Sequence, residues 1–131
     1  MESLNEDSWM RCIFCEIAAG RAESDTLYHD EVITAFRDVK PQAPTHILIV
    51  PIEHIASIGD LHRSGNSLVA RMLSTAHHLA EAEGIAEGGY RLVMNTGTEA
   101  GRMIDHLHLH LLGGRRMSQE TMALRFQDGL G

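Results

Sequence analysis

The segment His106-Leu-His-Leu-His-Leu-Leu112 carries the strongest structural and chemical signal in the chain. Alternation of polar and apolar residues predicts a β-strand, because successive side chains of a strand point to opposite faces of a sheet. The imidazoles of His106, His108 and His110 then share one face, with about 7 Å between successive rings. The leucines share the other face, which we expect to lie in the core. Imidazole serves as nucleophile, proton carrier and metal ligand near neutral pH.

Two other interpretations of this segment compete. A polar face that merely meets solvent is disfavoured by three histidines at alternate positions. A single metal ion bound by all three histidines is a better rival. However, same-face positions on one strand lie too far apart for three rings to meet one ion easily.

The rest of the chain predicts an antiparallel sheet of about five strands with one main helix, an α+β fold. Apolar residues between Leu68 and Ala80 recur at steps of three and four, so the main helix follows Ser64 and stops at Gly84. A short N-terminal helix is expected over Cys12–Ala19. The other strands are expected at Thr26–Tyr28, Val32–Arg37, His46–Val50 and Tyr90–Asn95.

Composition sets limits on location and partners. The chain has 131 residues, a formal net charge of -7 and nine histidines. Its pI near 5.6 argues against a nucleic-acid polymer as partner. The longest apolar run, 47–52, is too short to cross a membrane, and the acidic start lacks a signal pattern, so we expect a cytoplasmic protein. We expect a loose arm over 1–11, one domain over 12–116 and an unassigned tail over 117–131.

A glycine-containing loop, Asn95-Thr-Gly-Thr-Glu-Ala-Gly-Arg102, runs directly into the histidine segment. Its backbone amides can form a concave nest for an anion. The Asn95 side chain can donate a hydrogen bond, and Arg102 can pair with phosphate oxygens. Loop and histidines together predict a phosphate-bearing substrate attacked by an imidazole.

The pattern His-φ-His-φ-His-φ-φ, with φ apolar, is accompanied by PQAPTH at 41–46, YRLVMNTG at 90–97 and HLLGGR at 110–115. Together these motifs resemble the histidine triad (HIT) family, and its Hint-like branch, over roughly residues 12–116. The resemblance implies a homodimer in which the two sheets continue across the interface. It also implies hydrolysis of a purine nucleotide substrate through a nucleotidyl-histidine intermediate.

The resemblance assigns roles by position. His108 matches the nucleophile, His110 the residue that contacts the phosphate or handles the leaving-group proton, and His46 a further active-site histidine. From the sequence alone, His46 is equally well explained as a structural histidine of a buried strand with its hydrogen bonds made. The matching substrate-binding positions are Asp38 for the ribose, Ile13, Phe14, Phe36 and Val39 for the purine, and Asn95 and Gly101 for the phosphate. Asp38 can also be a turn residue, and the four apolar residues can also be plain core.

Arg102 and Met103 depart from the family pattern, which commonly has Gln and then Ser or Thr there. Arg102 can replace the lost contacts with a charge-assisted bond. It can instead shift preference toward a leaving group with negative charge, or point into solvent. Arg115 and Arg116, near the end of the histidine strand, are interpreted as solvated.

Cys12 and Cys15 lie one helical turn apart on the same side of the expected short helix. Zinc sites often use this spacing, but a single pair is weak evidence by itself, and its rivals are a redox pair and two inert thiols. The resemblance supplies His54 and His106 as further ligands, which implies a closed, structural Cys₂His₂ zinc site. His29, His62, His77 and His78 receive no function.

Three functions follow from this interpretation. The favoured one is hydrolysis of purine nucleoside phosphoramidates, such as AMP joined to an amine. The second is hydrolysis of dinucleoside polyphosphates or adenylyl sulfate, which Arg102 keeps open. The third is a nucleotide-binding regulator with vestigial catalysis, which the intact triad disfavours.

Overall fold

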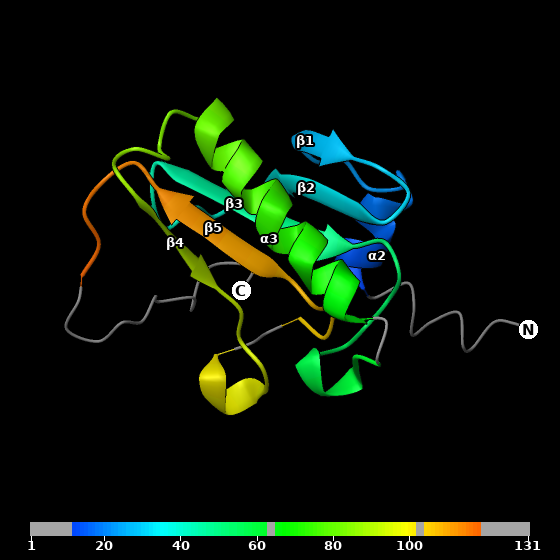
Figure 1. Ribbon diagram of the computed structural model, residues 1–131. Coiled ribbons are helices and arrows are strands. Elements are labelled where there is room, and N and C mark those ends of the chain that lie inside the picture. The colour runs from blue at the N-terminus through cyan, green and yellow to red at the C-terminus, as the bar shows by residue number, and fades with distance from the viewer. Residues whose placement is uncertain (1–11, 63–64, 102–103, 119–131) are drawn as a thin grey trace, which may run out of the picture.

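The structure is a computed structural model that describes residues 12–62, 65–101 and 104–118. The predicted arm at 1–11 and all but the start of the predicted tail lie outside the described residues. None of the described helices is both long and apolar enough to cross a membrane. The elements, in chain order (Figure 1), are α2 (Ile13–Ala18), β1 (Thr26–His29), β2 (Ile33–Arg37), β3 (Thr45–Pro51), η1 (Ile58–Asp60), α3 (Gly65–Ala82), β4 (Tyr90–Val93), η2 (Thr98–Ala100) and β5 (Leu109–Gly113).

The five strands form one antiparallel sheet in the order β1-β2-β3-β5-β4. The histidine-bearing β5 is therefore an internal strand. His110 stands opposite Leu48 of β3 on one side and Val93 of β4 on the other. Pairing on both sides holds the backbone of this segment in a single register.

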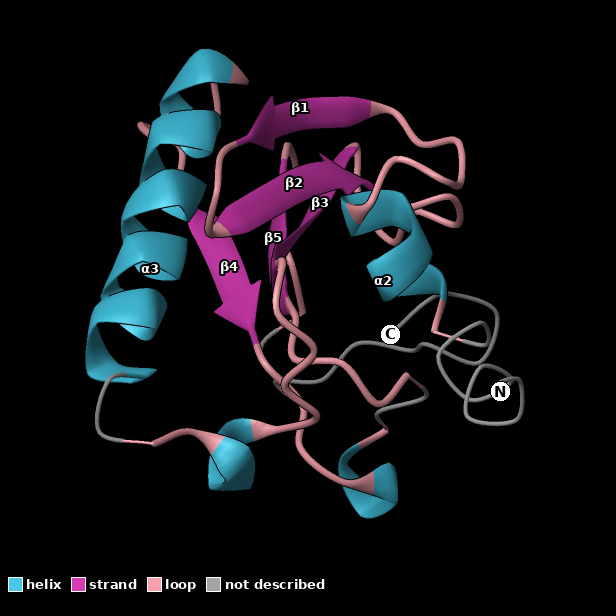
Figure 2. Ribbon diagram, turned by 90° about the vertical axis from the view of Figure 1, so that its right-hand side faces the viewer, coloured by secondary structure: helices cyan, strands magenta, loops and turns pink. Residues whose placement is uncertain are grey.

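The two faces of the sheet are covered by different helices, α3 on one face and α2 on the other (Figure 2). Alternate residues of β3 divide between the two resulting cores, so all of β3 is buried. Ile47 and Ile49 belong to the larger core with Met72 of α3. Leu48 and Val50 belong to the smaller core with Phe14 of α2 and Phe36.

The β1–β2 hairpin is fixed by the side chain of Asp30. Its Oδ1 accepts hydrogen bonds from the amides of Val32 and Ile33 at 2.7 and 2.8 Å, and its Oδ2 accepts one from Tyr28 and one from Arg71, both at 2.6 Å. Burial by itself raises the pKa of Asp30. The hydrogen bonds and the Arg71 charge outweigh burial and hold that pKa at about 2.

The predicted α+β fold, with a five-stranded sheet and one main helix, is confirmed. The largest boundary error is at the last strand, which begins at Leu109 instead of His106, and β4 also ends at Val93 instead of Asn95. The amide of Leu107 donates to the Ile55 carbonyl at 2.6 Å, and the carbonyl of His106 is taken by the His108 ring. These contacts take the place of sheet pairing, yet the alternation of side chains continues through them. The loop at 95–101 also contains the short helix η2.

Candidate active site and metal centre

The three triad histidines lie on the α2 face of the sheet, as the alternation predicts. The leucines between them, Leu107, Leu109 and Leu111, are buried in the core under α3. The ring of Phe14 makes edge contacts with both His106 and His108, at centroid distances of 5.9 and 5.1 Å. All three histidines are buried, so the protein fixes each ring instead of leaving it to solvent.

His106 and His110 belong to two different clusters and His108 belongs to neither, which excludes the single three-histidine metal site. His106 joins Cys12, Cys15 and His54, whereas His110 joins Asp38 and His46. His108 stands between the two clusters in sequence, with its ring 5.1 Å from that of His110.

The cysteine–histidine cluster has the spacing of a tetrahedral metal site. Nδ1 of His106 lies 3.3 Å from Sγ of Cys12 and 3.5 Å from Sγ of Cys15, and Nδ1 of His54 lies 3.1 Å from Sγ of Cys15. Ligand atoms around tetrahedral zinc are about 3.3–3.8 Å apart, given the usual zinc–sulfur and zinc–nitrogen bond lengths. The four residues therefore fit a Cys₂His₂ site for one metal ion.

A backbone contact fixes which nitrogen of His106 is available to a metal. Nε2 donates to the carbonyl of Pro51 at 2.9 Å, so Nδ1 carries the lone pair that faces the thiols. Burial lowers the pKa of His106 to about 4, against the bond to Pro51. Burial, followed by the neighbouring Cys12, raises the pKa of Cys15 to about 12. A bound divalent cation reverses the preference of such thiols and holds them as thiolates.

His108 has the protonation pattern that a nucleophile needs. Its Nδ1 lies 2.6 Å from the carbonyl oxygen of His106, which is an acceptor only. Nδ1 must therefore carry the proton, and Nε2 carries the lone pair. The backbone of one triad histidine thus orients the ring of the next.

His46 fixes the proton on His110 through a chain of contacts. The amide of Gln42 donates to Nδ1 of His46 at 2.9 Å, so the His46 proton sits on Nε2. Nε2 lies 2.9 Å from Nδ1 of His110 and 3.4 Å from Oδ2 of Asp38. Nδ1 of His110 therefore accepts, and its Nε2 carries a proton. Burial lowers the pKa of His46, and the charge of Asp38 opposes this shift. Burial, followed by the charges of His108 and His46, lowers the pKa of His110 to about 2.

The predicted substrate-binding residues divide into buried and exposed groups. Phe14 and Phe36 are fully buried against each other at 5.6 Å, which makes them core beneath the histidine face. Ile13 and Val39 are 38 % and 72 % exposed and offer apolar surface to a ligand. Asp38 is buried beside His46, and its Oδ1 accepts the amide of Lys40 at 2.9 Å.

The loop expected to bind phosphate is described only as far as Gly101. Asn95 is partly buried, and its Nδ2 is enclosed without a hydrogen-bond partner in the described part of the chain. Gly101 ends η2 with φ of 97°, a left-handed conformation that favours glycine. Arg102 and Met103, and with them the departure from the family pattern, lie outside the described residues.

Three backbone groups were missed by the sequence reasoning: the Gln42 amide and the carbonyls of Pro51 and His106. No side-chain signal marks such groups. Of the four unassigned histidines, His77 contacts Tyr90 at 2.7 Å and His78 lies 3.6 Å from Glu81. Such contacts are typical of surface histidines that take no part in catalysis or metal binding.

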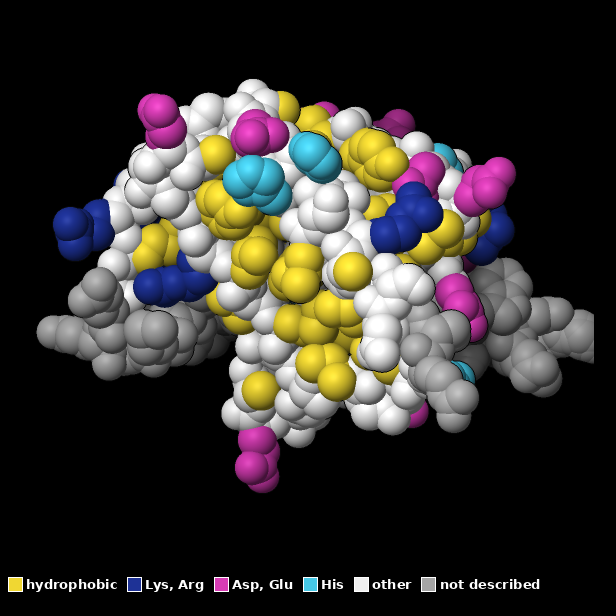
Figure 3. All heavy atoms as spheres, in the orientation of Figure 1, with side chains coloured by type: hydrophobic (Ala, Val, Ile, Leu, Met, Phe, Trp, Pro, Cys, Tyr) yellow, Lys and Arg dark blue, Asp and Glu magenta, His cyan; other side chains and the backbone are white. Residues whose placement is uncertain are grey.

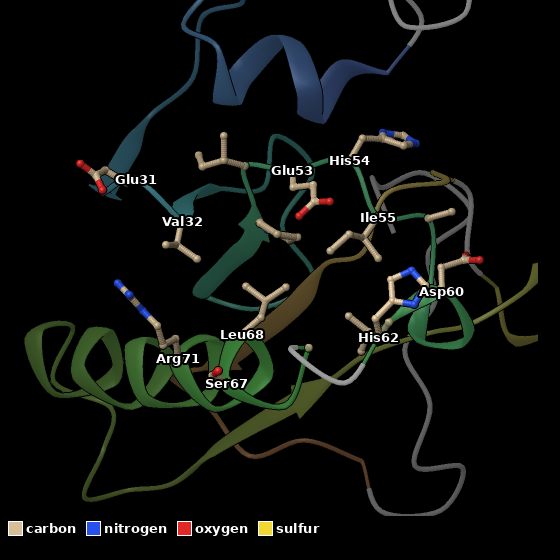
Figure 4. Close-up of a pocket in the computed structure, with 15 residues that line it drawn as sticks. Glu31, Val32, Glu53, His54, Ile55, Asp60, His62, Ser67, Leu68 and Arg71 are labelled. Carbon is tan, nitrogen blue, oxygen red and sulfur yellow. The ribbon is translucent and has the colours of Figure 1, made fainter.

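A pocket of about 910 Å³ opens on the α3 side of the sheet, away from the histidine face. Figure 4 shows Leu68 and Arg71 of α3 on one side of it and His54 on the other. Its floor includes Val32 and Ile55, which pack against the larger core. His54 and Pro51, whose carbonyl accepts from His106, both line this pocket, but none of the three triad histidines does.

This fold and its paired clusters define a histidine triad domain. Residues 19–117 match the HIT domain family, and the chain belongs to that family. It is 48 % identical over 103 residues to the purine nucleoside phosphoramidase of Escherichia coli K12, covering 79 % of this chain and 87 % of that protein. The relatives named here are hydrolases, in line with the predicted HIT-family enzyme.

Solved structures agree with this assignment. A HIT family hydrolase from Legionella pneumophila superposes with a TM-score of 0.81 at 49 % identity, covering 83 % of this chain and 97 % of that one. A HIT family hydrolase from Clostridium thermocellum also gives 0.81, at 42 % identity, covering 83 % and 95 %.

Proposed function

We propose that the protein hydrolyses purine nucleoside phosphoramidates and releases a nucleoside monophosphate through a covalent intermediate on His108. The observation that carries this proposal is the 2.6 Å contact from Nδ1 of His108 to the His106 carbonyl, which leaves Nε2 as the nucleophilic lone pair. The relative named as a purine nucleoside phosphoramidase supports the same substrate class.

In the proposed reaction, Nε2 of His108 attacks the α-phosphorus and the phosphorus–nitrogen bond breaks. The nitrogen takes the electron pair of that bond and a proton from solvent, and leaves as an amine. Water then attacks phosphorus and loses a proton to solvent, the bond to Nε2 breaks with its electron pair returning to the ring, and the monophosphate is released. Splitting one displacement into two lowers each barrier.

His110 supports these steps as a hydrogen-bond donor. Its Nε2–H, fixed by His46, is suited to a non-bridging phosphate oxygen, where charge develops in the transition state. The low pKa of His110 keeps the ring neutral, so contact with the phosphate suits it better than delivery of a proton. Asp38 would accept from the ribose hydroxyls, and Ile13 and Val39 would flank the purine.

The proposed metal is zinc, held by Cys12, Cys15, His54 and His106. All four positions are protein ligands, so a bound zinc has no open position for substrate and acts structurally. It would tie α2 to the histidine segment and would hold the His106 carbonyl that orients His108.

A homodimer is proposed from the free edge of the sheet. The outer edge of β4 has no partner strand in the described part of the chain, and such edges readily pair with another chain. Figure 3 shows apolar side chains over the centre of the α3 face. Leu73 of α3 is 44 % exposed. The proposed location is the cytoplasm, because Cys12 and Cys15 form no disulfide and a reducing compartment keeps such thiols available to a metal.

The test is a panel of an AMP–amine conjugate, a diadenosine polyphosphate and adenylyl sulfate, with AMP release followed for each. We expect the conjugate to be the best substrate and the variant His108→Asn to be inactive. Preference for the polyphosphate or the sulfate would select the second function. Release no faster than with His108→Asn for every compound would select the nucleotide-binding regulator and overturn the proposal.

A further inference from the structure

A second cavity, of about 630 Å³, lies at the end of the sheet where β4 starts and β5 ends. Its walls are the turn after α3, the start of β4 and the segment after β5, which meet at the left of Figure 1. None of the triad histidines lines it. The lining residues are Gly84, Ile85, Gly88, Gly89, Tyr90, Arg91, Gly114, Arg115, Arg116 and Met117.

The cavity gathers three arginines, Arg91, Arg115 and Arg116, in a protein of net charge -7. No carboxylate from the described part of the chain lines it. The other described arginines each form an ion pair with a carboxylate, as a surface arginine commonly does. Those pairs are Arg21–Glu16 at 3.0 Å, Arg37–Glu83 at 2.8 Å and Arg71–Asp30 at 2.6 Å.

The three arginines of the cavity are held differently. Arg91 donates to the carbonyl of Ser118 at 2.8 Å, and Arg115 donates to the carbonyl of Gln42 at 3.4 Å. Both acceptors are uncharged carbonyl groups. None of the three arginines has a carboxylate partner among residues 12–62, 65–101 and 104–118. Most of the donor capacity of the three guanidinium groups is therefore available to an anion.

Glycines keep the cavity hollow. A Cβ added at Gly84, Gly88 or Gly89 would meet nothing within 4 Å, so these positions leave open space. Gly114 has φ of 97°, and a Cβ there would come within 2.9 Å of Pro44. Both the backbone conformation and the contact with Pro44 therefore disfavour a side chain at position 114, immediately before Arg115 and Arg116.

We propose that this arginine–glycine cavity is a second ligand site that binds the phosphoryl group of a small molecule. Guanidinium groups match phosphate oxygens with paired donors, and several of them without carboxylates strongly favour a multiply charged anion. The volume is that of a small-molecule site. The site is distinct from the histidine face, since the two share no lining residue.

The test uses pyrophosphate as probe and the full ¹⁵N-labelled chain. Amide resonances of Gly88, Gly89 and Gly114 report the cavity, whereas those of Asn95 and Gly97 report the histidine face. We expect saturable shifts at the three cavity glycines. Sodium chloride at the same ionic strength should not reproduce them.

Three variants make the result specific. Arg115→Gln with Arg116→Gln should weaken pyrophosphate binding at the cavity at least about tenfold, through loss of charge-assisted bonds. Gly88→Glu should weaken pyrophosphate binding similarly, because it adds a carboxylate to the cavity. This variant tests the proposal even if the double variant does not fold. Arg21→Gln, which removes an ion-paired arginine, should bind as the unaltered chain does.

Either of two outcomes overturns the proposal. The first is that the cavity glycines do not shift, or shift equally with sodium chloride. The second is that the folded variants bind pyrophosphate as tightly as the unaltered chain. Shifts confined to Asn95 and Gly97 belong to the first outcome and leave the phosphoramidase proposal standing.

Discussion

Nε2 of His46 lies 2.9 Å from Nδ1 of His110, and this contact decides which nitrogen of His110 carries its proton. The amide of Gln42 donates to the other nitrogen of His46, Nδ1. A backbone group therefore fixes the direction of the hydrogen bonds from Gln42 through His46 to His110. His46 is therefore a positioning residue in the proposed reaction, acting through His110.

Replacing His46 with leucine should lower kcat by at least about a hundredfold, because His110 loses the donor that fixes its tautomer. KM for the nucleotide conjugate should change much less. His46→Gln keeps an N–H donor and should recover part of kcat, a rescue that a merely structural role does not predict. Equal kcat for both variants and the unaltered chain would contradict the assignment.

Cys15→Ser should lower the zinc content of the purified protein from about one equivalent to a small fraction, since a closed site needs all four ligands. The melting temperature should fall, as it should when a chelator is added to the unaltered chain. His62→Gln removes a histidine outside the cluster and is the matched control. Zinc below about a tenth of an equivalent in the unaltered protein would rule out the metal.

Asp30→Asn should reduce the free energy of unfolding by about 1 kcal/mol at pH 7, a figure discounted for the partial exposure of this surface carboxylate. The folded pKa of about 2 lies below the ordinary value, so the contribution is present above about pH 4 and is lost as the pH falls through 2. Denaturant unfolding of both proteins at pH 7 and pH 2 measures this, and a difference that persists unchanged at pH 2 would refute it.

Gly113→Ala should destabilise the fold by about 1–2 kcal/mol, because the added Cβ would lie 2.5 Å from Cδ1 of Ile85. Ile85→Val removes that methyl group. The double variant should therefore lose less stability than the sum of the two single variants, which urea unfolding can measure. Strict additivity would show that the contact with Ile85 is not the cause.

The local pattern predicts much of the sheet, for a physical reason. The HLHLHLL alternation assigns His108 and Leu109 to opposite faces, and the apolar run of β3 signals a strand buried on both sides. Strand ends are less well predicted: the alternation alone places the strand start at His106, whereas backbone contacts delay pairing until Leu109.

The site is only partly predictable from local sequence. Cys12 and His106 are 94 positions apart, and their contact depends on how α2 packs on the sheet, so the residues alone left the cysteine pair open. The groups that set the protons, such as the Gln42 amide and the Pro51 carbonyl, belong to the backbone and have no residue-type signature. Only packing distinguishes buried Phe14 from exposed Ile13 beside it.

The strict alternation along the last strand ties correct folding to correct chemistry. A slip of β5 by one residue against β3 would turn its leucines toward α2 and drive imidazoles into the apolar layer beneath α3. Such a molecule would lose its core and its nucleophile together. Few misaligned yet compact forms can therefore persist, and a chain that attains its native stability has also built its reactive face.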